Sequence, residues 1–257
     1  MEPKDWKDGE KIIGACMNCA DYKNLSALVK ELDEAGVDLY HLDIMDGTFV
    51  PNIALGPQDV KAIKELTGKV CDVHLMVQDA PKYIDMFVGL GAQIVHVHGE
   101  NDTQITRTLQ HIRDLGAKSS LAISPCTSFE TIQESLNVCD YVLVMRVNPG
   151  FAGQKALPFV DEKIKKLVEH KDEYGYKILV DGGVQAVQIG DDNVRAAVHQ
   201  LGGGGGLRGG VEPGAGPLHV HGHVGVHRLG AQGEGIHHAD ALGNGIAQVA
   251  DLIGGGP

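Results

Sequence analysis

The sequence lacks both a long apolar run and an apolar leader. No stretch of 18 or more apolar residues occurs, so no segment has the pattern of a transmembrane helix. The opening residues, MEPKDWKDGEK, are mostly charged and contain no apolar core of the kind that a secretion signal needs. We therefore expect a soluble, cytoplasmic protein with no membrane partner.

Basic residues are also fewer than acidic ones. The chain has 22 Lys and Arg against 34 Asp and Glu, a formal net charge of -12. It shows no basic stripe that would neutralise the phosphates of a nucleic acid, so we expect no nucleic-acid partner. A small anionic substrate is still compatible with this charge, because backbone N–H groups can bind a phosphate on an acidic protein.

The cysteines are few and odd in number, and they are scattered through apolar segments. The five are Cys16, Cys19, Cys71, Cys126 and Cys139. This pattern suits buried, reduced thiols better than a disulfide framework. The first two form a C-x-x-C pair, but the chain has no second pair and no histidine at zinc-finger spacing, so we do not assign a redox or zinc role to them.

Segments of strand length alternate with segments of helical period from residue 11 to about residue 184. Seven expected strands cover residues 11–17, 38–44, 69–76, 93–98, 118–124, 140–147 and 176–183. Six expected helices lie between them, at residues 24–36, 57–68, 81–91, 103–116, 128–137 and 159–170. The helical segments have apolar residues at three- and four-residue spacing, and several end in glycine. Such an alternation predicts right-handed βαβ units and a parallel sheet.

The number of units favours a TIM (β/α)8 barrel, whose typical length of about 250 residues suits this chain. A doubly wound α/β sheet is the alternative, but its G-x-G-x-x-G fingerprint is missing after the first strand. We expect a single TIM-barrel domain over residues 1–257, with clear βα units over 1–184 and an atypical Gly/His-rich segment over 185–257. The eighth βα unit is left open.

The segment 185–257 is compositionally unusual, since glycine and histidine crowd much of it. Its stretch LHVHGHVGV alternates like a strand, and GIAQVADLIG has the length of a short helix. We interpret the segment mainly as biased sequence of the kind that a shift in reading frame produces, and not as a metal site built from its histidines.

Four polar residues fall at the ends of expected strands, where a TIM barrel carries its chemistry. His41 and Asp43 are two residues apart, so they share one face of their strand, the interior if Leu42 points outward. His74 ends the third strand and Asp181 the seventh. Each alone is more often a rim or core group, but together they predict a site for a divalent metal ion such as Zn, Fe, Mn or Co.

Four blocks of sequence, HLDIMDGTFVPN, DVHLMV, VLVMRVNPGFAGQ and VDGGV, resemble those of the ribulose-phosphate 3-epimerase family in their order and separations. The resemblance covers roughly residues 12–184. It implies an isomerase in which Asp43 and Asp181 are the catalytic acid–base pair, while His41, Asp43, His74 and Asp181 hold the metal. One carboxylate would remove a proton beside a ketone, and the other would return a proton to the opposite face through a cis-enediolate.

The resemblance also implies residues that contact the substrate, a small sugar phosphate. Three methionines would form an apolar layer beside the planar intermediate, and the loop 148–154 would close over the phosphate. The expected substrate contacts are Cys16, Met45, His74, Met76, Met145, Gly150, Phe151, Ala152, Gly153, Gly182 and Gly183. Without the family, the methionines are equally compatible with ordinary core positions, and the motif NPG is a simple turn.

The chain departs from the family pattern at three places. Cys16 stands where the family usually has Ser, and ISPCTS replaces an Asn-Pro pattern after the fifth strand. After Val184 we find no block that resembles the usual eighth strand, which would supply part of the phosphate site. These departures affect the expected substrate contacts and leave the four predicted metal ligands in place.

The expected function is 3-epimerisation of D-ribulose 5-phosphate to D-xylulose 5-phosphate, within the pentose phosphate pathway of carbohydrate metabolism. One alternative is the 3-epimerisation of D-allulose 6-phosphate, and another is a barrel that is catalytically impaired because its last phosphate block is missing. A phosphate-binding barrel lyase is a further class, but it is expected to place a Lys beside the strand-end acids, and none is there. We also expect a homo-oligomer, whose number of copies the residues do not specify.

Overall fold

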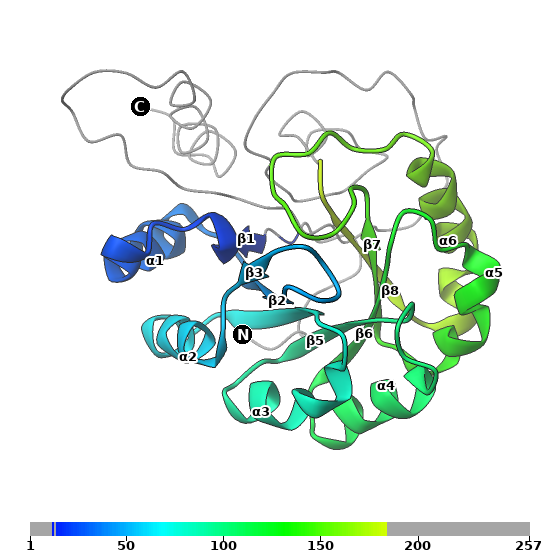
Figure 1. The fold of residues 1–257 in the computed structure, drawn as a ribbon, viewed down its shortest axis with the longest axis horizontal. Helices are drawn as coiled ribbons and strands as arrows, with labels where there is room; N and C mark the ends of the chain where they lie inside the picture. The colour runs from blue at the N-terminus through cyan, green and yellow to red at the C-terminus, as the bar shows by residue number, and fades with distance from the viewer. Residues whose placement is uncertain (1–11, 13, 184–257) are drawn as a thin grey trace.

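Seven parallel strands curl around a common interior in the computed structural model, which describes residues 12 and 14–183 (Figure 1). They neighbour one another in chain order, from β1 at one edge to β8 at the other. Their bounds are Gly14–Cys16 (β1), Leu39–Asp46 (β2), Val70–Met76 (β4), Ile94–His98 (β5), Lys118–Ile123 (β6), Tyr141–Met145 (β7) and Lys177–Asp181 (β8). Each of these strands was expected from the sequence.

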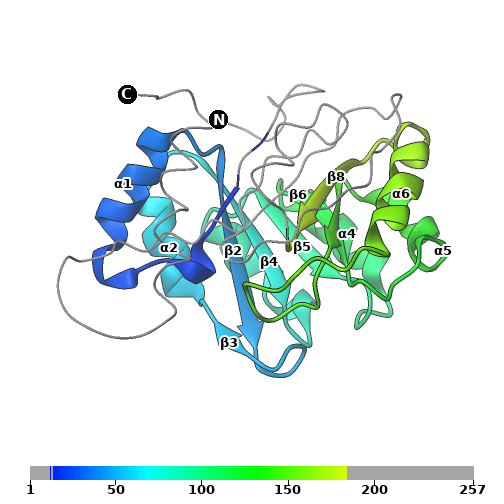
Figure 2. The ribbon, with the colours of Figure 1, turned by 90° about the horizontal axis from the view of Figure 1, so that it is seen from above.

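Helices connect the strands and cover the convex side of the curled sheet (Figures 1 and 2). The α-helices are Leu25–Ala35 (α1), Pro57–Leu66 (α2), Ile84–Gly89 (α3), Ile105–Asp114 (α4), Phe129–Ile132 (α5) and Val160–Tyr174 (α6). Four short 3-10 helices are Met17–Cys19 (η2), Tyr22–Asn24 (η3), Ala80–Lys82 (η4) and Gln133–Val138 (η5). A parallel sheet that curls with its helices outside is the architecture of a TIM barrel, so the expected fold class is confirmed.

The alternation of side chains along each strand separates two parts of the core. Leu42 and Ile44 of β2 point outward and belong to one buried cluster with Val60 and Ile63 of α2. Residues on the other face form a second cluster in the interior: Ile12, Leu39, Val70, Ile94, Ala122, Tyr141, Leu143, Met145, Val147 and Leu179. The first inward residues of β2, β4 and β5 are apolar: Leu39, Val70 and Ile94. The next inward residues are polar: His41, Asp72 and His96.

One short strand was not expected. β3, Ile53–Ala54, pairs antiparallel with the end of β2. Gly47 makes the turn possible, because it has a φ of +73° and donates its N–H to the carbonyl of Asn52 at 2.9 Å. Asp46 accepts the N–H of Phe49 at 2.9 Å. The block that follows the second barrel strand is therefore an ordered hairpin, and its two-residue strand is too short to be visible as periodicity.

The expected helix at residues 128–137 is divided between an α-helix, α5, and a 3-10 helix, η5. Ser128 caps the first part by accepting the N–H of Thr131. Phe129, Ile132 and Leu136 are nevertheless all buried, so the spacing of three and four residues that predicted a helix still selects one apolar side.

The expectations for the eighth βα unit and for segment 185–257 fall outside the described residues. In the part of the chain that the structure describes, β1 and β8 are the two edges of the parallel sheet. None of the helices in that part is long and apolar enough to cross a membrane.

Candidate active site

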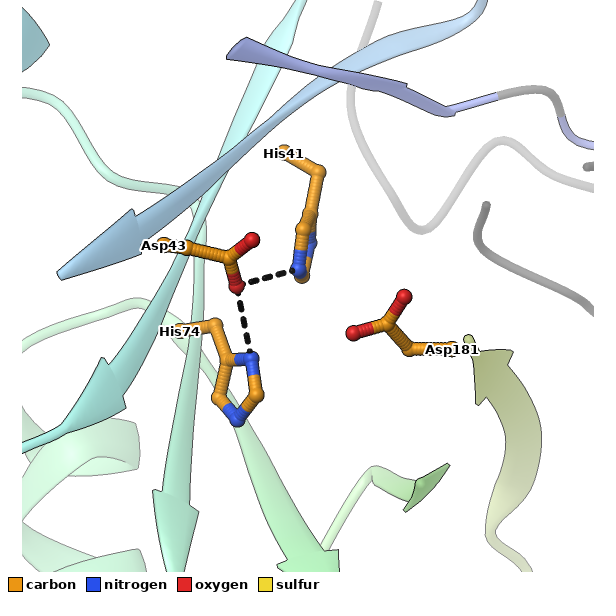
Figure 3. Close-up of side chains that lie close together, drawn as sticks. All are labelled: His41, Asp43, His74 and Asp181. Atoms are coloured by element: carbon orange, nitrogen blue, oxygen red, sulfur yellow. Dashed lines mark hydrogen bonds and ion pairs between the residues drawn. The ribbon is translucent and has the colours of Figure 1, made fainter. Parts of the chain in front are cut away.

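The four predicted metal ligands meet inside the curl of the sheet. His41 and Asp43 lie on β2, His74 on β4 and Asp181 at the end of β8. All four are buried, and each offers one ligand atom within 4.8 Å of the others. Figure 3 shows the carboxyl group of Asp181 facing the other three side chains from the opposite side. The structure thus brings the four residues together, while their roles stay predictions.

Strand register explains why two of these residues are neighbours. Asp43 of β2 lies directly opposite His74 of β4. Inward-pointing residues at paired positions of neighbouring strands have β-carbons about 5 Å apart, so their side chains are in contact. Asp181 reaches the same point from β8, which is five strands away along the sheet, because the sheet curls.

Asp43 is the common partner of the site. One of its oxygens, Oδ1, lies 3.1 Å from His41 Nε2 and 2.9 Å from His74 Nδ1 (Figure 3). The other oxygen, Oδ2, accepts the thiol hydrogen of Cys16 at 3.2 Å. Burial raises the pKa of the Cys16 thiol, and the nearby Cys19 and Asp43 raise it further, so the thiol keeps its proton and donates it to the carboxylate. The cysteine that replaces the usual serine therefore still donates a hydrogen bond at this position.

His98 and Glu100 extend the site, and sequence reasoning missed both. His74 Nε2 lies 2.9 Å from His98 Nε2, and His98 Nδ1 lies 2.9 Å from Glu100 Oε2. The alternation HVH, residues 96–98, gives β5 two inward histidines, and this pattern was the signal that could have revealed them. Because the Glu100 carboxylate can only accept, His98 donates to it from Nδ1. The Nδ1 hydrogen of His74 in turn points to Asp43, whose carboxylate accepts it.

The two imidazoles of the predicted metal site differ in basicity. Burial lowers the pKa of His41, but the negative charges of Asp72 and Asp43 outweigh it, so the pKa is raised well above its ordinary value. Burial lowers the pKa of His74, and the hydrogen bond and charge of Asp43 only partly oppose this. In the metal-free chain, therefore, both ring nitrogens of His41 are protonated near neutral pH and the ring is positively charged, whereas the ring of His74 is neutral.

The donor set fits a divalent cation. The carboxylate oxygens of Asp43 and Asp181 converge on one point with His41 Nε2 and His74 Nδ1, and the two nitrogens become electron-pair donors once the protons directed at Asp43 leave. A metal ion would replace those protons as the positive charge that offsets the repulsion between the two buried carboxylates. Mixed nitrogen and oxygen donors suit Zn, Fe, Mn or Co better than Ca or Mg, which prefer oxygen alone.

The three methionines of the expected apolar layer are all buried but do not form one group. Met45 and Met76 lie opposite each other at the ends of β2 and β4 and pack with Val50. Met145 ends β7, opposite Asp181 of β8, and belongs to the interior cluster instead. Two of the three therefore form one apolar cluster, and the third packs with other residues beside Asp181.

The loop 148–154 follows β7 and is held to the hairpin after β2. Asn52 donates its side-chain N–H to the carbonyl of Gly150 at 2.8 Å, across 98 residues of sequence. Phe151 and Ala152 are exposed, and Gly150 and Gly153 have φ values of +120° and +77°. The expected substrate loop thus contacts the chain that follows the first two predicted ligands.

The two glycines after β8 lie against the chain that leaves β7. Gly182 and Gly183 have left-handed backbone, with φ values of +91° and +67°. A β-carbon on Gly182 would lie 2.4 Å from a methyl carbon of Val147, and one on Gly183 would lie 2.5 Å from the backbone nitrogen of Ala156. Both the conformation and the close approach require glycine here.

We expect Gly183→Ala to lower the free energy of unfolding by more than the ~1 to 2 kcal/mol that a left-handed backbone alone costs. The excess comes from the overlap of the new β-carbon with the main chain of Ala156. Gly175→Ala is the matched control, because Gly175 has a φ of +79° and no atom within 4 Å of an added β-carbon. Urea unfolding of the two variants measures the difference, and equal losses would contradict the close approach.

Glu100 gives a pH-dependent contribution to stability. Burial raises its pKa, but hydrogen bonds from His98, Thr127 and the backbone of Ser124 lower it to about 2, from an ordinary value of 4.5. A carboxyl with a lowered pKa in the folded state stabilises the fold above its unfolded pKa and loses this effect as pH falls through the folded value. The contribution is therefore complete at pH 7 and declines below about pH 4.5.

We accordingly expect Glu100→Gln to lower the free energy of unfolding at pH 7 by about 3 kcal/mol, the order that such a pKa difference implies. The gap between the variant and the parent chain should shrink below about pH 4.5. Glu130→Gln serves as the control, because Glu130 pairs with Lys166 on the exposed surface and its effect should vanish in salt. Urea titrations from pH 7 to pH 3 decide the point, and a gap that does not change with pH would contradict it.

Known proteins resemble this chain in fold and in sequence. KGPDC from Streptococcus mutans superposes with a TM-score of 0.56 over 94% of this chain and 96% of that one, at 12% identity. A mutant tryptophan synthase alpha-subunit from Pyrococcus furiosus gives a TM-score of 0.52 over 70% of this chain and 80% of the other, at 13% identity. At such low identity these likenesses concern the fold alone, and they agree with the TIM-barrel class.

Sequence comparison is more specific. Ribulose-phosphate 3-epimerase from Synechocystis sp. is 43% identical over 178 residues, which cover 68% of this chain and 77% of that protein. The enzyme of the same name from Bacillus subtilis is 42% identical over 168 residues, 64% of this chain and 77% of its own. The model of the ribulose-phosphate 3 epimerase family matches residues 12–202, which corrects the expectation that the likeness ends at Val184. The chain therefore belongs to the ribulose-phosphate 3-epimerase family and is an isomerase.

Proposed function

We propose that this chain interconverts D-ribulose 5-phosphate and D-xylulose 5-phosphate by epimerisation at C3. The observation that carries the proposal is the pair of buried carboxylates, Asp43 on β2 and Asp181 on β8, which approach one point from two sides (Figure 3). Relatives named ribulose-phosphate 3-epimerase support the proposal, and the one from Synechocystis sp. is 43% identical over 178 aligned residues. A centre with two facing carboxylates is what an inversion of configuration at a carbon acid needs.

The two aspartates divide the proton transfer. One carboxylate removes the C3 proton from one face of the substrate, and the electron pair of the broken C–H bond moves into an enediolate that spans C2 and C3. The other aspartate, as a carboxylic acid, donates a proton to C3 from the opposite face, which produces the other epimer. In the reverse direction the two residues exchange roles. Asp43 is kept in place for this by the thiol of Cys16 and the imidazoles of His41 and His74.

The same side chains would hold a divalent metal. His41 Nε2, His74 Nδ1 and the carboxylates of Asp43 and Asp181 are the proposed ligands. A metal bound there supplies positive charge that stabilises the oxygens of the enediolate and makes the C3 proton more acidic. Burial of all four ligands excludes water from the carbon that is deprotonated, and this strengthens each electrostatic interaction.

The remaining predicted contacts would bind the rest of the sugar phosphate. Met45 and Met76 supply an apolar, polarisable surface beside the planar intermediate. The loop 148–154 and the two glycines after β8 allow a phosphate to approach backbone N–H groups without obstruction by side chains. We propose these groups as the phosphate site, together with the ordered hairpin that holds the loop.

Exchange of the C3 hydrogen with solvent tests the proposal directly. In deuterium oxide, with Zn²⁺, Fe²⁺, Mn²⁺ or Co²⁺ added, D-ribulose 5-phosphate should take up one deuterium at C3 and give D-xylulose 5-phosphate. D-Allulose 6-phosphate, measured in parallel, should exchange more slowly. No exchange with either substrate would reject the epimerase proposal, and faster exchange of the hexulose phosphate would reassign the substrate.

A further inference from the structure

A second chain of buried polar groups adjoins the proposed metal site. His41 Nδ1 lies 3.0 Å from Asp72 Oδ1, Asp72 Oδ2 lies 2.8 Å from His96 Nε2, and His96 Nδ1 lies 2.7 Å from Ser120 Oγ. The four residues come from the consecutive barrel strands β2, β4, β5 and β6, and each is 0% exposed. The proposed chemistry uses only His41 among them.

The contacts determine where the protons lie. Asp72 is a carboxylate with two nitrogen partners, so it accepts a hydrogen from each of them. A neutral His96 then has its proton on Nε2 and accepts the hydroxyl hydrogen of Ser120 at Nδ1. His41 likewise has a proton on Nδ1, and its Nε2 is the nitrogen directed toward Asp43. The chain therefore keeps a proton on Nδ1 of His41, so that Nε2 is the nitrogen that can bind a metal once its own proton leaves.

Packing does not explain Asp72. A carboxylate without contact with solvent loses hydration worth several kcal/mol, and an apolar residue of similar size would avoid that loss. Val70, two residues earlier on the same face of β4, shows that this interior accepts an apolar side chain. The pairing of Asp72 with two imidazoles at normal hydrogen-bond distances offsets the loss only if both donors are held in place.

We propose that Asp72 is a positioning residue that orients His41 as a metal ligand, and that His96 and Ser120 hold Asp72 in turn. The inference rests on the metal site proposed above. A carboxylate that accepts the second N–H of a ligating imidazole fixes the orientation of the ring and raises its basicity as a ligand. His74 has a comparable support on its far side in His98, so both imidazole ligands are anchored by groups that do not contact the metal position.

The carboxamide Asp72→Asn is the first test. Its side chain can accept only one of the two N–H groups, and its own amide opposes the other, so His41 loses a fixed orientation. We expect the dissociation constant of Co²⁺, measured by competition with a chelator, to rise about 10- to 100-fold, and the visible absorption of bound Co²⁺ to change in shape. Asp140→Asn is the matched control, because Asp140 is a hydrogen-bonded carboxylate that contacts Arg113 outside the barrel. It should leave the affinity and the spectrum unchanged.

A pair of substitutions at His96 provides a test that leaves Asp72 in place. His96→Gln retains an N–H that can donate to Asp72, so its Co²⁺ affinity should stay within about threefold of the parent chain, whereas His96→Leu removes the donor and should lose about tenfold. The tautomer can also be read without any substitution. In the Zn²⁺-loaded parent chain labelled with ¹⁵N-histidine, His41 should carry its proton on Nδ1.

The outcomes separate this inference from the proposed function. A parent chain that binds no metal would refute the proposed metal site and the inference with it. If the parent binds one metal, an unchanged affinity and spectrum in Asp72→Asn, or a proton on Nε2 of His41, would refute the inference alone. If Asp72→Asn does not fold, equal affinities of the two His96 variants would refute it. A second metal ion bound by His41, Asp72 and His96 would also refute it, because Asp72 and His96 would then be ligands themselves.

Discussion

Asparagine in place of Asp43 or of Asp181 is expected to reduce turnover at least about a hundredfold, the low end for removal of a general acid or base. An amide can neither take the C3 proton nor return it. Because the two aspartates address opposite faces of the substrate, the variants should differ in which epimer loses its hydrogen exchange first. Turnover in both directions, and deuterium uptake from each epimer, measure these effects.

A carboxylate at the opposite end of the barrel is the control for these variants. Asp33, near the end of α1 and so beside the start of β2, accepts hydrogen bonds from Tyr40 and Thr67, so Asp33→Asn should cost stability and leave turnover unchanged. Near-normal epimerisation by Asp43→Asn or Asp181→Asn would refute the assignment of two proton-transferring aspartates.

Removal of the metal is expected to abolish activity. A divalent cation at this site would supply the positive charge that stabilises the enediolate oxygens, and without it their negative charge is poorly compensated among buried carboxylates. Zn²⁺, Fe²⁺, Mn²⁺ or Co²⁺ should restore turnover, whereas Ca²⁺ should not, because two of the ligands are imidazoles.

The measurement needs metal analysis alongside activity. Exhaustively chelated protein is assayed, its metal content is determined, and each ion is then added back. Full turnover in chelated protein with no measurable metal would require the four residues to be reinterpreted as a hydrogen-bonded acid cluster. Ligands must lose their protons to bind, so the affinity for each ion should also fall as the pH is lowered.

The sequence predicted the helices and strands correctly wherever apolar residues recur at a regular spacing. All seven barrel strands and all six helices were expected, because buried strands and amphipathic helices need apolar residues at regular spacing. β3 was missed, since two residues cannot display a period, and its formation depends on the turn at Gly47 and on pairing with β2. The change of helical type at residue 133 was also invisible, because both types bury Phe129, Ile132 and Leu136.

The residues of the site could be predicted from the sequence where they lie at the carboxyl ends of strands. His41, Asp43, His74 and Asp181 were found together because a barrel gathers the carboxyl ends of its strands. The groups that support them required register, which no local pattern gives. Asp72 lies opposite His41, and His96 opposite Ser120, only once β2, β4, β5 and β6 are aligned, and a shift by one residue would turn each of them to the other face.

The hydrogen bond between Asn52 and Gly150 has a consequence for anyone who wishes to transplant this site. It joins the connections that follow β2 and β7, and a β-carbon added to Gly150 would lie 3.1 Å from the β-carbon of Val50, so little space is left between them. A designer who moves only one of these connections into another barrel scaffold would remove half of a matched pair and leave the other half without its counterpart. The two segments, residues 47–54 and 148–154, are thus one module for engineering, although 98 residues separate the atoms that connect them.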